Sequence, residues 1–124
     1  MGARRPHLPL ALPAVSLALL AGCGATTRVA QNGTLHVALS EYSVRPQNVS
    51  AHSGALTILV HNYGRLSHDL VISLDGRPEL STKPIPPGQS AELTATLTPG
   101  TYLMDSTILA DQALGAYGTL TVHS

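Results

Sequence analysis

Tryptophan and phenylalanine are absent from this 124-residue sequence, and four tyrosines are its only aromatic residues. A hydrophobic core built from this chain must therefore rest on leucine, valine, isoleucine and tyrosine. Charged residues are also scarce: they make up 11% of the chain, as seven basic and seven acidic side chains, with no run of basic residues. Nucleic-acid binding depends on clustered lysine and arginine. The composition therefore excludes nucleic acid as an expected partner.

A single cysteine, Cys23, is the only thiol of the chain. One thiol cannot form a disulfide within the chain, so a domain of this length must be stabilised by burial of its apolar side chains. Cys23 stands at the end of an apolar stretch, residues 8–21. That stretch is shorter than the roughly 20 apolar residues that a membrane-spanning helix requires, and prolines interrupt it. A transmembrane helix is therefore not expected here.

The start of the chain has the architecture of a secretory signal peptide, because Arg4 and Arg5 precede the apolar stretch and small residues end it. The sequence Leu20-Ala21-Gly22-Cys23 resembles the lipobox of bacterial lipoproteins. This resemblance implies cleavage after residue 22 and acylation of Cys23. Several acyl chains on one residue anchor a protein stably, since each buried CH₂ contributes about 0.8 kcal/mol. We expect residues 1–22 to be a lipoprotein signal peptide, and Cys23 to hold the protein at the extracytoplasmic face of the cell membrane.

Two aspects of export stay open at this point. Arg4 and Arg5 also fit a twin-arginine signal, although any positively charged start supplies arginines. An ordinary secretory signal with an incidental cysteine and an uncleaved anchor are the alternatives to lipidation of Cys23.

From residue 23 onward the chain divides into two predicted parts. Residues 23–33 are small and polar, and are interpreted as the lipidated N-terminus and a tether. Residues 34–124 are predicted to form one domain. From Cys23 onward there are five basic and seven acidic residues, a formal net charge of −2.

The predicted domain shows period-two alternation of apolar and polar residues, which is typical of β-strands. The turn signals Asn62-Tyr63-Gly64, Asp75-Gly76 and Pro99-Gly100 separate these stretches. No window predicts an amphipathic helix, and residues 109–114 could form one turn at most. Six to eight short strands with turns every eight to twelve residues predict an all-β sandwich. The expected strands cover residues 35–39, 55–61, 69–74, 91–97, 102–104 and 118–122.

Several of these features occur in an order that resembles the cupredoxins, small Greek-key β-sandwiches that carry blue copper. Asn62-Tyr63-Gly64 is followed by His68, and Pro99-Gly100-Thr101-Tyr102 leads to Gly115-Ala116-Tyr117-Gly118. The resemblance covers most of residues 34–123. It implies a cupredoxin-like Greek-key sandwich.

The resemblance also implies where copper ligands would stand. His68 occupies the position of the first histidine ligand, while Ser106, Asp111 and Ala116 occupy those of the cysteine, the second histidine and the methionine. A blue-copper site requires a thiolate with two imidazoles. The only thiol is Cys23, at the terminus that we expect to be acylated. We therefore expect no blue-copper centre and no cofactor.

A weak metal site is the alternative. His68 and Asp111 could meet as one imidazole and one carboxylate, a vestigial site for copper, with Ser106 a poor third ligand because a neutral hydroxyl competes badly with water. His68 could equally be a structural histidine that forms hydrogen bonds across the loop. A two-histidine site of His61 and His68, with Asp69, is a further alternative. The other histidines of the predicted domain are expected to be surface residues: His36, His52 and His123.

No enzymatic activity is expected. Ser106, His68 and Asp105 or Asp111 form a triad by composition alone, without the glycine-flanked nucleophile of hydrolases. The leading interpretation is a membrane-anchored, extracytoplasmic cupredoxin-like lipoprotein that acts as a binding or structural module for another envelope protein. Its alternative is an envelope copper carrier or sensor that uses His68 with Asp111 or His61.

The loop before the last strand would carry the recognition surface, because loops on a rigid scaffold commonly do so. It contains Ile108, Leu109, Leu114 and Tyr117. These side chains are either exposed for a partner or folded inward to fill the space of the missing metal, and the sequence leaves both readings open.

Overall fold

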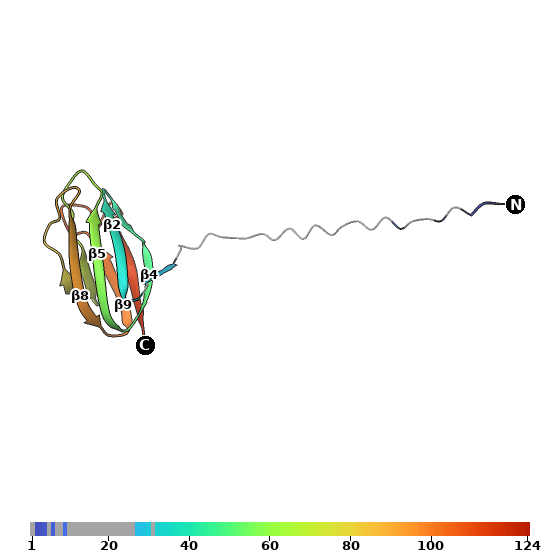
Figure 1. Cartoon of the computed structure of the whole chain (residues 1–124). Helices are drawn as coiled ribbons and strands as arrows, with labels where there is room; N and C mark the ends of the chain where they lie inside the picture. Colours follow the sequence, from blue (N-terminus) through green and yellow to red (C-terminus); the bar gives the residue numbers. More distant parts are fainter. Residues whose placement is uncertain (1, 5, 7–8, 10–26, 31) are drawn as a thin grey trace.

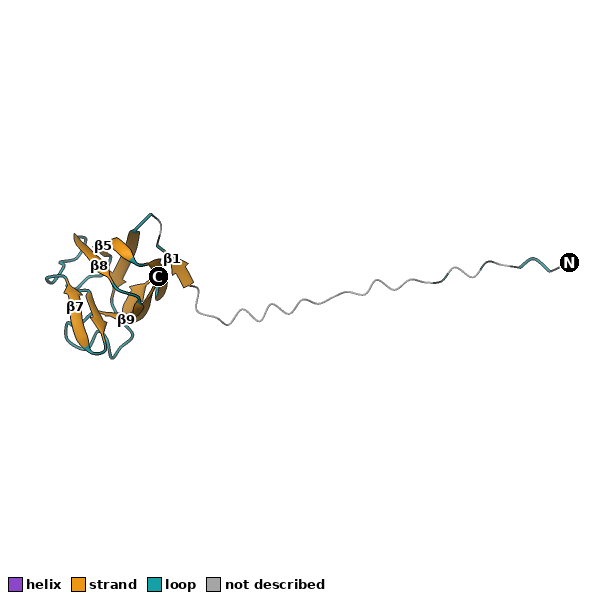
Figure 2. Cartoon of the chain, turned by 90° about the horizontal axis from the view of Figure 1, so that it is seen from below, coloured by secondary structure: helices purple, strands orange, loops and turns teal. Residues whose placement is uncertain are grey.

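Two facing β-sheets, one of six strands and one of four, make up the domain. The computed structural model of this chain describes residues 2–4, 6, 9, 27–30 and 32–124. The larger sheet has the order β1 (Thr27–Val29), β4 (Asn48–His52), β10 (Tyr117–His123), β9 (Gly100–Asp105), β6 (Val71–Leu74), β7 (Arg77–Ser81). The smaller sheet has the order β3 (Ser43–Arg45), β2 (Thr34–Ser40), β5 (Gly54–Asn62), β8 (Ser90–Leu97). Figure 1 shows β2, β5 and β8 side by side, and Figure 2 views the sandwich from the end at which the C-terminus lies. The predicted all-β sandwich is confirmed.

The described residues form ten strands, compared with the six to eight expected. Two of the ten, β1 and β3, are three-residue edge strands. Such short strands carry too few residues to show a period-two pattern, so they are recognisable only by their pairing. β4 and β7 were also outside the expected set, and the Asn48–His52 strand pairs with both β1 and β10.

Side-chain alternation places the core between the sheets. On β2, Leu35, Val37 and Leu39 are buried while His36 is exposed. On the facing sheet, Tyr102 is the largest fully buried side chain, and its hydroxyl donates a hydrogen bond to the carbonyl oxygen of Thr98 at 2.8 Å. This bond removes the cost of burying an unpaired phenol.

Both sheets mix parallel and antiparallel pairs. β4 runs parallel to β1 and to β10, and β2 runs parallel to β5, whereas the remaining pairs are antiparallel. Parallel neighbours require a connection that crosses from one end of the sandwich to the other. Different connections between strands therefore lie at the two ends of the sandwich.

The predicted tether contributes an edge strand, because Thr27–Val29 pairs with Asn48, Val49 and Ser50 of β4. The sheet therefore includes residues that lie before residue 34, the predicted start of the domain. Cys23, the lipobox and most of the predicted signal peptide lie outside the described residues. In the part of the chain that the structure describes, no helix is long and apolar enough to cross a membrane.

Candidate functional site

Three connections meet at one end of the sandwich and contain the residues singled out from the sequence. They are the turn between β2 and β3, the connection between β5 and β6, and the loop between β9 and β10. Hydrogen bonds link the three. Glu41 of the β2–β3 turn accepts from Arg65 of the β5–β6 connection, and His68 of that connection bonds Asp111 of the β9–β10 loop. We call this group of loops the site end.

Asn62 organises the β5–β6 connection. Its buried side-chain amide donates to the carbonyl oxygens of Leu66 and Ile85, both at 2.8 Å, and its Oδ1 accepts from the backbone N–H of Gly64 at 2.8 Å. An asparagine that bonds a backbone N–H two residues on forms an Asx-turn. The Asn62-Tyr63-Gly64 turn therefore has a structural role: it fixes the backbone that leads to the buried His68.

His68 lies at the centre of the site end and is only 1% exposed. Its backbone pairs with Ile85 in an isolated bridge. The ring nitrogen Nδ1 lies 2.6 Å from Oδ2 of Asp111, and Nε2 lies 3.3 Å from Oε1 of Glu41. A carboxylate only accepts hydrogen bonds, so the short contact is one in which Nδ1–H of His68 donates to Asp111. The structure thus joins His68 and Asp111 directly, across 43 positions of sequence.

The other two expected ligand positions are part of the same cluster. Oγ of Ser106 donates to Oδ2 of Asp111 at 2.7 Å, so this single oxygen accepts from both His68 and Ser106. The backbone N–H of Ser106 donates to the carbonyl oxygen of Ala116 at 3.0 Å, and that of Ala116 donates to Asp111 at 2.9 Å. All four positions that the resemblance aligned with copper ligands therefore converge.

Their chemistry does not fit a blue-copper group. The thiolate position holds a hydroxyl, Ala116 has no donor atom, and Oδ2 of Asp111 already bonds the imidazole and the hydroxyl that would face a metal. A hydroxyl is a weak ligand for copper compared with a thiolate. Across the described residues, no group of three or more histidine, cysteine, aspartate and glutamate side chains is arranged to hold a metal ion.

Glu41 closes the cluster from the β2–β3 side, and the sequence analysis did not single it out. Its Oε1 accepts from the backbone N–H groups of Leu66 at 2.9 Å and Arg65 at 2.6 Å. These hydrogen bonds, that of Leu66 first, lower the pKa of Glu41 from 4.5 to about 2. A Cβ on Gly64 would lie 2.6 Å from the same oxygen and 2.9 Å from Nε2 of His68, so a side chain at this position would push the Glu41 carboxylate away from the imidazole.

Asp69 bonds the start of the β9–β10 loop. Its carboxylate accepts from the backbone N–H and the hydroxyl of Thr107, both at 2.6 Å, and from Ser106 at 3.3 Å. The proposed site of His61, His68 and Asp69 does not form. His61 lies between the buried Val60 and Asn62 on β5 and so points outward, with Nδ1 2.6 Å from Oγ of Ser90.

Asp105 is a buried carboxyl beside this network, and its Oδ1 has no hydrogen-bond partner. Burial, followed by repulsion from Asp69, raises its pKa above the ordinary 3.8. An ionised carboxylate is therefore less favourable here than in the unfolded chain.

We expect Asp105→Asn to increase the free energy of unfolding at pH 7 by about 1 kcal/mol, because the amide carries no charge and can donate where a carboxylate only accepts. The folded protein has the higher pKa at this group, so it binds more protons than the unfolded chain above pH 3.8. The advantage of the variant should therefore grow as the pH rises from about 4. Urea unfolding across this range measures it, and an advantage that is the same at every pH would contradict the explanation.

Large apolar side chains surround the site end. Those that are exposed in the described residues are all on its three loops or at the start of β10: Tyr42, Tyr63, Leu66, Leu109, Leu114 and Tyr117. We call this set the apolar rim. Leu109 is 93% exposed and Tyr63 is 71% exposed, whereas Ile108 is half-buried. The structure thus favours the exposed reading of the β9–β10 loop, and Ser106, Asp111 and Ala116 are the residues that fill the interior beneath it.

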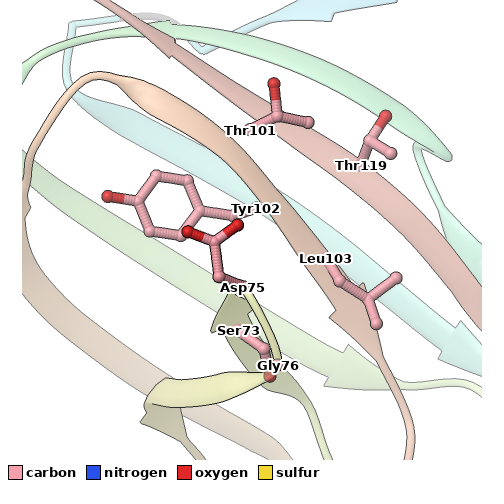
Figure 3. A pocket seen from close by; sticks show the side chains of 7 residues that line it. All are labelled: Ser73, Asp75, Gly76, Thr101, Tyr102, Leu103 and Thr119. Atoms are coloured by element: carbon pink, nitrogen blue, oxygen red, sulfur yellow. The ribbon is translucent and has the colours of Figure 1, made fainter.

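A separate hollow lies between β9, β10 and the turn that joins β6 to β7 (Figure 3). Its lining consists of Ser73, Asp75, Gly76, Thr101, Tyr102, Leu103 and Thr119. The hydroxyl of Tyr102 is already bonded to Thr98, and Asp75 is the only carboxylate of the lining. The hollow therefore offers no pair of groups for acid–base chemistry.

Comparison with solved structures identifies the fold. The reduced form of auracyanin from the photosynthetic bacterium Roseiflexus castenholzii superposes with a TM-score of 0.69 at 22% identity, over 77% of this chain and 99% of auracyanin. Rusticyanin from Thiobacillus ferrooxidans has a TM-score of 0.62 at 18% identity, over 80% and 82%. A multicopper oxidase has a TM-score of 0.56 at 22% identity, over 72% of this chain and 41% of the oxidase.

No protein-family model matches this sequence, and no curated protein matches it. The likeness to solved structures, at these identities, concerns the fold and not the activity. It agrees with the two sheets and with the buried core between them. The chain has a cupredoxin-like β-sandwich fold.

Proposed function

We propose that this chain is a membrane-anchored, extracytoplasmic lipoprotein whose cupredoxin-like domain has no blue-copper centre and binds another protein of the cell envelope. In this proposal residues 1–22 are removed, Cys23 carries the lipid, and the apolar rim is the binding surface. The apolar rim is the observation that carries the proposal.

The arrangement of the rim supports a binding role. Soluble domains usually scatter exposed apolar side chains singly, and a contiguous group of them marks an interaction site. Here the six side chains of the rim share one end of the sandwich, held by loops that hydrogen bonds cross-link. Three of the six are tyrosines, a residue type enriched in protein interfaces.

The donor chemistry supports the loss of electron transfer. Ser106, Asp111 and Ala116 stand where the resemblance places the thiolate, the second imidazole and the thioether. Asp111 accepts hydrogen bonds from His68 and Ser106. The cluster then serves as a polar scaffold for the loops that present the rim.

The lipobox supports anchoring through Cys23. Three residues separate Cys23 from Thr27, the first residue of β1, so the four steps of backbone between them can span at most about 14 Å. The domain would therefore stay close to the bilayer and meet partners in the same membrane. Cys23→Ser is expected to abolish incorporation of labelled fatty acid and to release the protein from membranes.

Site-specific photo-crosslinking in intact cells tests the binding role. A photo-activatable residue at Leu109 should give a discrete protein adduct, whereas one at Thr94, exposed on β8, should not. The adduct should disappear when Tyr63 and Leu66 are both replaced by glutamate, because the new charges would have to be desolvated in the interface. The same adduct from both positions, or none from Leu109, would refute the proposal.

Weak copper handling is the second candidate, favoured by the 2.6 Å contact between His68 and Asp111 and by the copper protein rusticyanin among the similar structures. A metal would have to displace the hydrogen bonds that Asp111 accepts. Titration of residues 27–124 with Cu(II) and Cu(I) tests it. Micromolar or tighter binding that His68→Ala abolishes would support this candidate, and unchanged binding in His68→Ala would exclude it.

The chain is proposed not to be an enzyme. In a catalytic triad the histidine stands between the serine and the carboxylate. Here His68 and Ser106 instead bond the same oxygen of Asp111, and Ser106 is buried. Ser106 thus donates to a carboxylate and not to a histidine, unlike the serine of a triad.

A further inference from the structure

His52 and His123 are neighbours across two strands, although 71 positions separate them in the sequence. β4 and β10 run parallel, and their register pairs Val122 with Ala51 and His123 with His52. The backbone N–H of Ser53 donates to the carbonyl oxygen of His123 at 2.5 Å, which fixes this end of the pairing. The position of one histidine backbone relative to the other is therefore set by the sheet.

Both side chains point to the same side. Ala51 and Val122, which precede the two histidines, are buried in the core, so the alternation of a strand directs the histidines outward. Both are exposed. Neighbouring strands lie about 4.8 Å apart, and residues in register on one face are in side-chain contact range.

From this placement we propose that His52 and His123 form a surface site for a late first-row divalent cation, with copper(II) bound most tightly. Two imidazole nitrogens that each lie about 2.0–2.1 Å from one ion are within about 4 Å of each other, a spacing that adjacent exposed rings can reach. Imidazole suits copper, zinc and nickel, and copper(II) leads the order of affinities. Water completes the coordination, because the paired residues nearest along the strands, Ser50 and Thr121, are neutral hydroxyls.

This site is independent of the proposed function and of the site end. The register pair of His52 and His123 lies at the end of β10, whereas Tyr117, of the apolar rim, lies at its start. The site needs no rearrangement of the cluster around His68, so the two metal hypotheses can be tested separately by substitution.

The test is a titration of the full chain in detergent with Cu(II), in a buffer that does not coordinate metals, followed by calorimetry and by electron paramagnetic resonance. We expect one Cu(II) per chain with two nitrogen ligands. His52→Ala and His123→Ala should each weaken binding by about tenfold or more, and the double variant should resemble the single ones. His36→Ala, at an exposed histidine of β2 that is not part of the pair, is the matched control and should leave binding unchanged.

Three results would overturn the site. They are binding that neither His52→Ala nor His123→Ala weakens, binding that only His68→Ala abolishes, and one Cu(II) shared between two chains. Circular dichroism of each variant separates loss of the ligand from loss of the fold, since both histidines are on the surface and their replacement should leave the spectrum unchanged.

Discussion

Replacement of Asp111 by alanine is expected to lower the free energy of unfolding by about 3–5 kcal/mol. The substitution removes the oxygen that accepts hydrogen bonds from both His68 and Ser106, and each of these side chains is 1% exposed. Water cannot easily replace the lost acceptor, so Nδ1 of His68 would be buried without a partner and Ser106 would keep only its longer, 3.3 Å hydrogen bond to Asp69. Equilibrium urea unfolding of residues 27–124, followed by circular dichroism, measures the loss.

Gln112 provides the control for this prediction, because it is the exposed neighbour of Asp111 in the same loop. Gln112→Ala should change the stability by no more than about 0.5 kcal/mol. Asp111→Asn should lie between the two, since its amide keeps one oxygen as an acceptor but carries no charge. A loss below about 1 kcal/mol for Asp111→Ala would show that the cluster contributes little to stability.

Replacement of Gly118 by alanine is expected to cost about 3 kcal/mol, at the upper end for an overpacked position. Gly118 lies on β10, where a Cβ would overlap the carbonyl oxygen of Gln47 and lie 3.0 Å from its carbonyl carbon. The same oxygen accepts a 2.7 Å hydrogen bond from the backbone N–H of Thr119. The obstacle is the backbone of Gln47, which a backbone hydrogen bond holds in place, so no side-chain rotation can relieve it. Gln47 and the start of β4, which follows it, must move away from β10.

Gly100→Ala is the matched control for this prediction. Gly100 is on β9, the other neighbour of β10, and a Cβ there would meet Leu74 Cδ1 at 3.5 Å, which is an ordinary contact. Its stability should change by about 1 kcal/mol or less. If Gly118→Ala unfolds at the same urea concentration as Gly100→Ala, the predicted overlap between a side chain at position 118 and the Gln47 backbone is contradicted.

The Gly118 result bears on the site end as well. β10 begins at Tyr117 of the apolar rim, and Ala116 directly before it bonds both Ser106 and Asp111 through its backbone. A shift of β4 against β10 would therefore move the β9–β10 loop. Loss of stability and loss of the Leu109 crosslink should accompany each other in Gly118→Ala.

The sequence by itself determined the fold class and the limits of the site chemistry. Alternation along residues 35–39, 55–61 and 91–97 is a local property, and the strands β2, β5 and β8 form where it predicts them. The same is true of ligand chemistry: a chain with one cysteine, at position 23, has no other thiol to offer, whatever its fold. Both inferences depend on residue identity and spacing alone.

Only the tertiary structure decided which side chains meet. Glu41 bonds His68 across 27 positions, and His52 lies beside His123 through a parallel register that no local pattern encodes. The short strands β1 and β3 were missed for the same reason, since three residues show no period and are defined by their partners. Period two tells which face a residue occupies, but the neighbour on that face depends on strand order and register, which the packing of the whole sandwich sets.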